Sequence, residues 1–188
     1  SLTFLFLFSG SVFGQEEVKE GHWDNGKLKW KEHYKDGKKD GVATFWYKNG
    51  QVETESHYKD GKLNGLLSRW YPNGKKMSEI PYIDGKENGF ATSWYISGEK
   101  RQEENYKDGK VNGVQTWWYK SDKKEEERHY KNGKESGLRT KWFENGKKDM
   151  ETYYKKGKKN GLVINYSDSC NIILEENDYQ LQADMNED

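Results

Sequence analysis

Residues 41–64 read GVATFWYKNGQVETESHYKDGKLN, and this pattern decides the fold. Residues 42–47 are mostly β-branched or aromatic, as strands prefer. Lys48-Asn49-Gly50 is a turn signal, because Asn-Gly readily adopts positive φ. Residues 51–58 predict a second strand, and Lys59-Asp60-Gly61-Lys62 predicts a second turn. The stretch therefore predicts one β-hairpin, joined to the next by a turn of about four to six residues.

The same pattern returns along the chain with a fixed step of 24 residues. Three of its positions hold Trp46, Trp70, Trp94, Trp118 and Trp142 (then Tyr166), Tyr34, Tyr58, Tyr82, Tyr106, Tyr130 and Tyr154, and Gly37, Gly61, Gly85, Gly109, Gly133 and Gly157. A fixed period in this range indicates a tandem-repeat protein in which each unit packs on its neighbours. We predict an all-β fold: an elongated single-layer antiparallel sheet of stacked β-hairpins, built as a solenoid of 24-residue repeats.

The composition supports a folded chain despite its low hydrophobicity. Only 31% of the 188 residues are hydrophobic and 34% are charged, a balance that approaches that of disordered segments. Eight Trp, thirteen Tyr and seven Phe offset it, because each buried ring removes roughly 150–250 Å² from water. The scarcity of aliphatic residues predicts a narrow seam of packed rings in place of a thick core.

The two ends differ from the repeats. An apolar run over residues 2–8 and small residues up to Gly14 predict a signal peptide over residues 1–14, with an ordinary apolar strand as the alternative. We therefore expect export to the periplasm, outer surface or medium. The repeat domain is expected over residues 15–179 and an acidic tail over residues 180–188.

Charge is also unevenly distributed. All 32 basic residues and 25 of the 32 acidic residues precede Asp168, so that part carries a formal charge of +7. This indicates either a basic binding surface or interspersed charges on solvated faces. Cys170 is the only cysteine, which leaves a buried thiol or a disulfide between chains.

Strand alternation divides the side chains between two faces. One face holds Val42, Thr44, Trp46 and their uniform repeat equivalents, and we predict that it is the buried seam. The opposite face is variable, so any recognition surface is expected there. Aromatic residues are favoured contacts because they add area at small entropic cost. The candidate contacts are Tyr47, Tyr71, Tyr95, Tyr119, Phe143 and Trp117; the alternative is that these rings stack on one another to stabilise the sheet.

No motif predicts an enzyme, a cofactor site or a metal site. Glutamate recurs from Glu55 to Glu175, and His33, His57 and His129 share one column. Equivalent positions of adjacent hairpins lie roughly 10 Å apart, which is too far to share one ion. Glu–Lys ladders and a polar surface column explain these residues better. Basic turns with aromatics could bind single-stranded nucleic acid, but a neutral exported chain argues against it.

The motif Trp-Tyr-x-Asn-Gly, then Glu, then Tyr-x-x-Gly-Lys-x-x-Gly resembles the MORN repeat (membrane occupation and recognition nexus), and more closely its bacterial variant in the YwqK-type antitoxin family. The resemblance covers about residues 22–177. It implies a twisted antiparallel sheet of hairpins, no enzyme, protein–protein scaffolding and contact with phospholipid. A toxin-neutralising role is one expectation, although an exported protein would not meet a cytoplasmic toxin.

The Gly, Trp-Tyr and Asn-Gly hairpins also resemble choline- and cell-wall-binding repeats, whose aromatic cages hold cations. Those units are shorter and lack the Tyr-x-x-Gly-Lys-x-x-Gly half. The sequence therefore predicts a non-enzymatic, exported scaffold for another protein, with a glycan-binding module and an antitoxin as alternatives.

Overall fold

The computed structural model describes residues 14–167 and 172–175, and side chains within residues 14–167. These residues form strands and turns, and no helix is found among them. The chain divides into two compact units, residues 1–110 and 111–188, which are described separately. The predicted signal peptide, the acidic tail and Cys170 lie outside the described residues, apart from Gly14.

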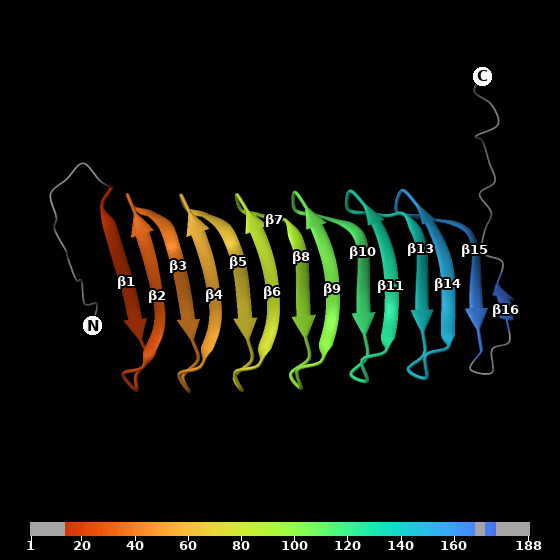
Figure 1. Cartoon of the computed structure of the whole chain (residues 1–188), viewed down its shortest axis with the longest axis horizontal. Coiled ribbons are helices and arrows are strands. Elements are labelled where there is room, and N and C mark those ends of the chain that lie inside the picture. The colour runs from red at the N-terminus through yellow and green to blue at the C-terminus, as the bar shows by residue number, and fades with distance from the viewer. Residues whose placement is uncertain (1–13, 168–171, 176–188) are drawn as a thin grey trace, which may run out of the picture. The chain divides into compact units, whose positions relative to one another are not determined.

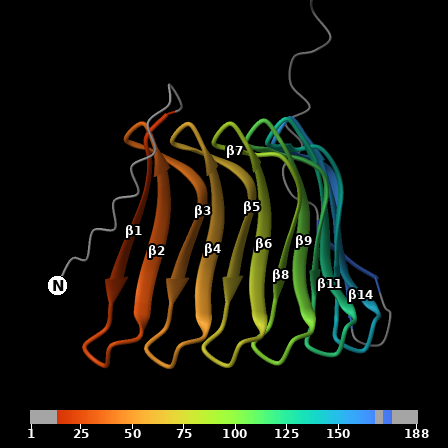
Figure 2. The same ribbon diagram turned by 60° about the vertical axis from the view of Figure 1, so that its left-hand side comes forward.

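The first unit is a single-layer antiparallel sheet (Figures 1 and 2). Its strands are β1 (Glu16–His22), β2 (Leu28–Lys35), β3 (Lys38–Trp46), β4 (Val52–Lys59), β5 (Lys62–Trp70), β6 (Lys76–Ile83), β7 (Lys86–Glu87), β8 (Gly89–Trp94) and β9 (Lys100–Lys107). They follow one another in the order β1-β2-β3-β4-β5-β6-β8-β9, and the short β7 also pairs with β6. Every connection in this unit is therefore a hairpin.

The second unit repeats the same arrangement. Its strands are β10 (Lys110–Trp118), β11 (Lys124–Lys131), β12 (Lys134–Glu135), β13 (Gly137–Trp142), β14 (Lys148–Lys155), β15 (Lys158–Tyr166) and β16 (Ile172–Glu175). The order is β10-β11-β13-β14-β15-β16, with β12 beside β11. The predicted all-β fold of stacked antiparallel hairpins is confirmed within each unit.

The two kinds of turn are built differently. Lys59 pairs with Lys62 around Asp60 and Gly61, which both have positive φ, 49° and 82°. This two-residue type I′ turn is shorter than the predicted connection of four to six residues, because Asp-Gly alone matches the twist of the flanking strands. At the other end of the hairpin, Gly50 donates its N–H to the Tyr47 carbonyl and is the residue with positive φ.

A second glycine column bends the long strands. Gly41 has φ +100°, and the pairing of β2 with β3 shifts beside it. The bend turns the Val42 carbonyl toward His33, whose Nδ1 lies 2.6 Å from that oxygen. His57 and His129 make the same contact with Leu66 and Leu138, at 3.0 and 2.7 Å. The histidine column, expected to be a polar surface column, thus serves the backbone at each bend.

Cross-strand pairs identify the two faces of the sheet. The tryptophan face carries Trp46, Trp70 and Trp94 in the first unit and Trp118 and Trp142 in the second. The tyrosine face is the opposite one, which carries the column from Tyr34 to Tyr154. On the tyrosine face, Ala43 lies opposite Ser56 and Arg139 lies opposite Thr152.

The predicted burial of the tryptophan face is wrong except in its serine and threonine column, where Ser68, Thr116 and Thr140 are buried. The most buried apolar side chains, Ala43, Leu67, Ala91 and Val163, belong to the tyrosine face. On the tryptophan face Leu66, Phe90, Val114, Leu138 and Leu162 are 38–68% exposed. Sequence alternation tells which residues share a face, but it does not tell which face is covered. Here small residues lie beneath long tyrosine, lysine and glutamate side chains, so the tyrosine face is the more buried.

Candidate interaction surface

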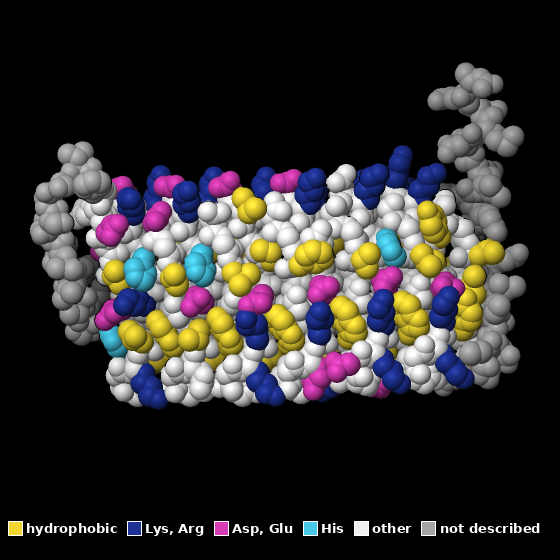
Figure 3. Space-filling model, viewed as in Figure 1, with side chains coloured by type: hydrophobic (Ala, Val, Ile, Leu, Met, Phe, Trp, Pro, Cys, Tyr) yellow, Lys and Arg dark blue, Asp and Glu magenta, His cyan; other side chains and the backbone are white. Residues whose placement is uncertain are grey.

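In each unit the tryptophan face carries regularly repeated ion pairs (Figure 3, where the histidine side chains identify this face). Each of four lysines follows a hairpin turn and binds the glutamate three residues later. The pairs are Lys76–Glu79, Lys100–Glu103 (2.8 Å), Lys124–Glu127 (2.6 Å) and Lys148–Glu151 (2.6 Å). The expected Glu–Lys ladder exists in these four repeats, and its lysines are those of this column.

These lysines also lie against the tryptophan rings. Lys76 Nζ is 5.9 Å from the Trp70 ring centre and 6.0 Å from that of Trp94. In the second unit, Lys124 Nζ is 5.8 Å from the Trp142 ring centre. A cation over the face of an indole ring is attracted to it, and the contact is reinforced here by the neighbouring carboxylate. The tryptophan column is consequently half-buried, with protein cations on its ring faces.

An exposed apolar row runs beside these ion pairs. In the first unit it includes Val18, Leu66 and Phe90, which are 39%, 38% and 68% exposed. The row lies on the tryptophan face, because Val18 pairs with His33 and Leu66 pairs with Pro81. The second unit shows Val114, Leu138 and Leu162 in the same column. Exposed apolar residues that recur on one face in this way are typical of an interaction surface.

The candidate tyrosines hold neighbouring repeats together. The hydroxyls of Tyr47, Tyr71 and Tyr119 donate to the carbonyls of Trp70, Trp94 and Trp142, at 2.7–2.8 Å. Tyr95 and Phe143 occupy the same half-buried position, and Phe143 has no hydroxyl. All of these residues lie at the turns that follow the tryptophan column, not on the variable face. Their role as partner contacts stays a prediction.

Trp117 lies apart from the other candidates, on the tyrosine face opposite Glu126. The Arg128 guanidinium carbon is 4.8 Å from the Trp117 ring centre. Glu126, which is 9% exposed, accepts hydrogen bonds from Arg128 and Arg139. Burial raises the pKa of the Glu126 carboxyl, but the two guanidinium groups outweigh it, so the pKa lies below its ordinary value.

Glu32 shows the same balance in the first unit. Burial raises its pKa, while hydrogen bonds from Lys39 and Tyr34 lower it more, so the net shift is downward. The Glu32 carboxylate in turn raises the pKa of Tyr34 to about 12. These carboxyls remain charged at neutral pH and bind neighbouring side chains. None is raised toward neutrality as a general acid would need.

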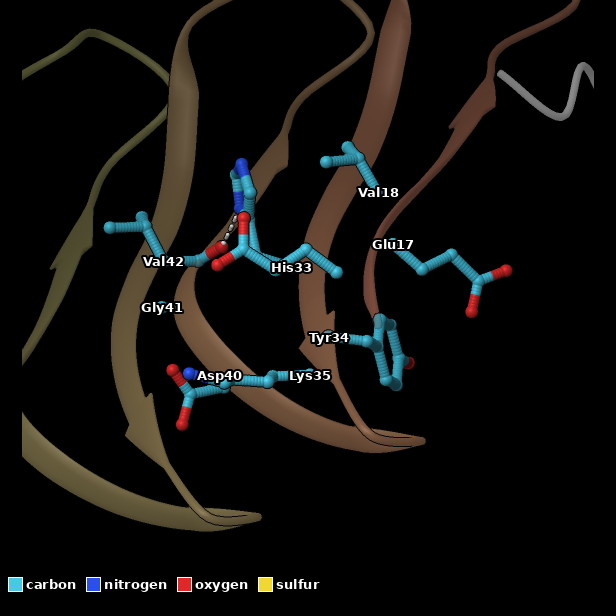
Figure 4. Close-up of a pocket in the computed structure, with 9 residues that line it drawn as sticks. Glu17, Val18, His33, Tyr34, Lys35, Asp40, Gly41 and Val42 are labelled. Carbon is cyan, nitrogen blue, oxygen red and sulfur yellow. Dashed lines mark hydrogen bonds between the residues drawn. The ribbon is translucent and has the colours of Figure 1, made fainter. Parts of the chain in front are cut away.

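A surface pocket of about 380 Å³ lies at the β1–β3 end of the first unit (Figure 4). Glu17, Val18, His33, Tyr34 and Asp40 are among its lining residues. Figure 4 shows the His33 ring directed at the Val42 carbonyl, and the Nδ1 atom of the ring is engaged in a hydrogen bond with that oxygen. The histidine therefore serves the strand bend, and the lining offers no nucleophile–base pair.

Within the described residues, no group of three His, Cys, Asp or Glu side chains is placed to hold a metal ion. The described part of the chain also contains no helix long and apolar enough to cross a membrane.

Sequence reasoning missed the lysine column from Lys76 to Lys148. Its signal was present, because a lysine stands six residues after four successive tryptophans beginning with Trp70. The cross-strand partner could be read only from the register, which pairs Trp70 with Lys76.

Comparison with known proteins gives one family. No curated protein matches the chain. The family model described as the MORN repeat variant matches it four times, over residues 39–60, 63–84, 111–132 and 135–156. Each match spans the longer turn that follows a tryptophan of the column, together with the two strands that this turn joins. Four segments of the chain are therefore similar to the MORN repeat variant, two in each unit.

Proposed function

We propose that the protein is a non-enzymatic scaffold that binds another protein through the tryptophan face. MORN repeats are generally modules for contact with proteins or membranes, and they are not known as an enzyme family. The observation that carries the proposal is the exposed apolar row, whose most exposed member is Phe90 at 68%. Many modest contacts along such a row add up to specific binding.

The charges beside the row favour a protein over a membrane. Glu79 and Glu103 lie on the same face, each opposite a threonine or serine, beside the apolar column. Their ion pairs with Lys76 and Lys100 leave this row without the excess positive charge that draws a protein to an anionic membrane surface. A protein partner can supply polar groups that match these ion pairs one by one.

The lysines weigh against the glycan and choline alternative. An aromatic cage binds a ligand cation through open ring faces. Lys76 already lies near the faces of both Trp70 and Trp94, and Lys124 lies near that of Trp142. Sugar rings stacked on these indoles would have to displace the protein's own cations.

We further propose that the protein is exported, on the strength of the apolar run over residues 2–8. Expression with this segment intact and N-terminal sequencing of the product tests the proposal. A mature chain that starts near Gln15 in the envelope or medium supports it. A chain retained in the cytoplasm contradicts it and would reopen the YwqK-type antitoxin hypothesis.

Retention of a partner by immobilised residues 15–188 tests the scaffold. Envelope protein extract, isolated cell wall and anionic vesicles are applied separately to the wild type, Phe90→Ser and Ile96→Ser. Ile96 is the matched control, because it is 54% exposed but lies in a turn away from the row.

We expect one discrete protein on the wild type and on Ile96→Ser, with several-fold less on Phe90→Ser. Equal retention by all three forms would contradict the proposed surface. Wall material released by choline would instead establish the glycan-binding class.

A further inference from the structure

Three hairpins of the first unit carry a tryptophan of the column, and one of these three lacks the regular lysine. In the next hairpin along, Lys76 pairs with Trp70 across the strands, and its ammonium lies near two indole rings and binds Glu79. The equivalent of Lys76 one repeat earlier is Val52, which pairs with Trp46. Figure 3 shows the consequence: the row of yellow side chains is unbroken here, whereas dark blue lysines interrupt it further along β5–β9.

The rest of the arrangement is retained. Trp46 and Trp70 stand one repeat apart on β3 and β5, and β4 with Val52 lies between them. Glu55 occupies the position of Glu79, between Thr44 and Ser68 on the adjacent strands. Glu55 has no hydrogen bond or ion pair to any side chain within residues 14–167. Trp46, Val52, Glu55 and Trp70 are called the Val52 site below.

We propose that the Val52 site binds a lysine side chain of the partner protein. The neighbouring repeat shows the chemistry directly, because the equivalent residues Trp70, Trp94 and Glu79 hold the protein's own lysine there. The Val52 side chain is short and uncharged, so it cannot form an ion pair with Glu55. It does provide an apolar surface along which an alkyl stem can lie. A lysine supplies both the four-carbon stem and the ammonium group.

The inference rests on the proposed function, since the lysine belongs to the partner protein. It deepens that function by naming one contact residue and its place. The ammonium would gain cation–π attraction from the indoles and an ion pair with Glu55. A free alkylammonium ion should therefore bind weakly, with a dissociation constant on the order of 10–100 mM.

The test uses n-butylammonium chloride, which is a lysine side chain without its backbone. It is titrated into ¹⁵N-labelled protein at constant ionic strength, and the indole N–H signals of the eight tryptophans are followed. We expect saturable shifts at Trp46 and Trp70 only, and none with n-butanol. Similar shifts at all tryptophans, or no shifts at all, would overturn the proposal.

Two opposite substitutions make the test specific. Val52→Lys should place the protein's own ammonium group in the site. The apparent affinity for n-butylammonium should then fall at least tenfold. Lys76→Val should create a new response at Trp70 and Trp94 beside Glu79. Both substitutions are at half-exposed positions, and retained signal dispersion confirms the fold. A response that survives Val52→Lys, or that fails to appear in Lys76→Val, contradicts the site. The scaffold function is judged separately by partner retention, which needs no ammonium ligand.

Discussion

Gly61 and Gly65 look alike in the sequence, because each stands in a column that returns every 24 residues. The structure separates their roles. A Cβ at Gly61 would meet nothing closer than Lys38 Cβ at 3.7 Å, and φ is +82°. A Cβ at Gly65 would lie 2.8 Å from His57 Cβ, and φ is +124°.

Gly65→Ala is therefore expected to destabilise the first unit far more than Gly61→Ala. Both variants force a side chain into positive φ, which costs about 1–2 kcal/mol. Only Gly65→Ala adds a steric clash with a backbone-anchored atom, so about 3 kcal/mol or more is expected. Urea unfolding of both variants provides the comparison. Equal losses would show that the bend has no close contact with His57.

The hydroxyl of Tyr71 gives a second prediction for a single residue. It donates a 2.8 Å hydrogen bond to the Trp94 carbonyl in the next repeat. Tyr71→Phe keeps the ring and removes the donor, so we expect a loss of about 0.5–1.5 kcal/mol in the free energy of unfolding. Tyr153→Phe is the control, because Tyr153 is 49% exposed and its hydroxyl makes no hydrogen bond within the described residues. If both variants unfold alike, the bond between repeats contributes nothing.

Among the strands, Glu126 on β11 joins Arg128 on the same strand to Arg139 on β13. Its pKa is lower in the folded protein than in the unfolded chain. The carboxylate therefore adds stability above its unfolded pKa of about 4.3, and this stability is lost as pH falls through the lower folded value.

We accordingly expect Glu126→Gln to lower the stability of the second unit at pH 7 by about 1–3 kcal/mol. The difference from wild type should shrink as pH falls below about 4, because the wild-type carboxyl then becomes protonated too. Thermal unfolding of both proteins at pH 7 and pH 3 measures this. A difference that stays constant with pH would mean that the ion pairs do not carry the effect.

The strands themselves were predictable from the sequence, because turns and aromatic residues recur without a slip in register. The covered face was not. Val42 and Ala43 lie on opposite faces of the same strand. Which of the two is buried depends on how far the neighbouring side chains extend over it. Glu32 lies opposite Ala43 and binds Tyr34 and Lys39, and this arrangement depends on three-dimensional packing.

For the whole chain, repetition was the strongest signal, and departures from it carry the functional information. The sequence identified the aromatic columns and predicted partner contacts at Tyr47 and its equivalents, which stays a prediction. It did not show that the hydroxyls of Tyr47, Tyr71 and Tyr119 bind carbonyls of the following repeat. It could not identify the Val52 site. Val52 becomes informative only when the register shows that Lys76, at the same position, lies between two tryptophans.

Repetition also predicts how the chain tolerates deletions. Removing residues 62–85 takes out one complete repeat and joins Gly61 to Lys86, which preserves the Asp-Gly-Lys turn. The remaining strands keep their antiparallel order, so a folded protein with a slightly lower melting temperature is expected. Removing residues 62–73 takes out β5 with most of the next turn. The flanking strands β4 and β6 run in the same direction, so they would become neighbours joined by a short turn. A short turn can join only antiparallel strands.

Thermal unfolding followed by circular dichroism compares the two deletions with the full chain. We expect one cooperative loss of sheet signal in the 24-residue deletion and a large loss of folded signal in the 12-residue deletion. The shorter deletion removes fewer residues but disrupts the alternation of strand direction. Equal melting of the two deletion proteins would therefore mean that hairpin stacking does not determine stability. The expected difference would instead show that stability follows the integrity of the repeat and not the number of residues retained.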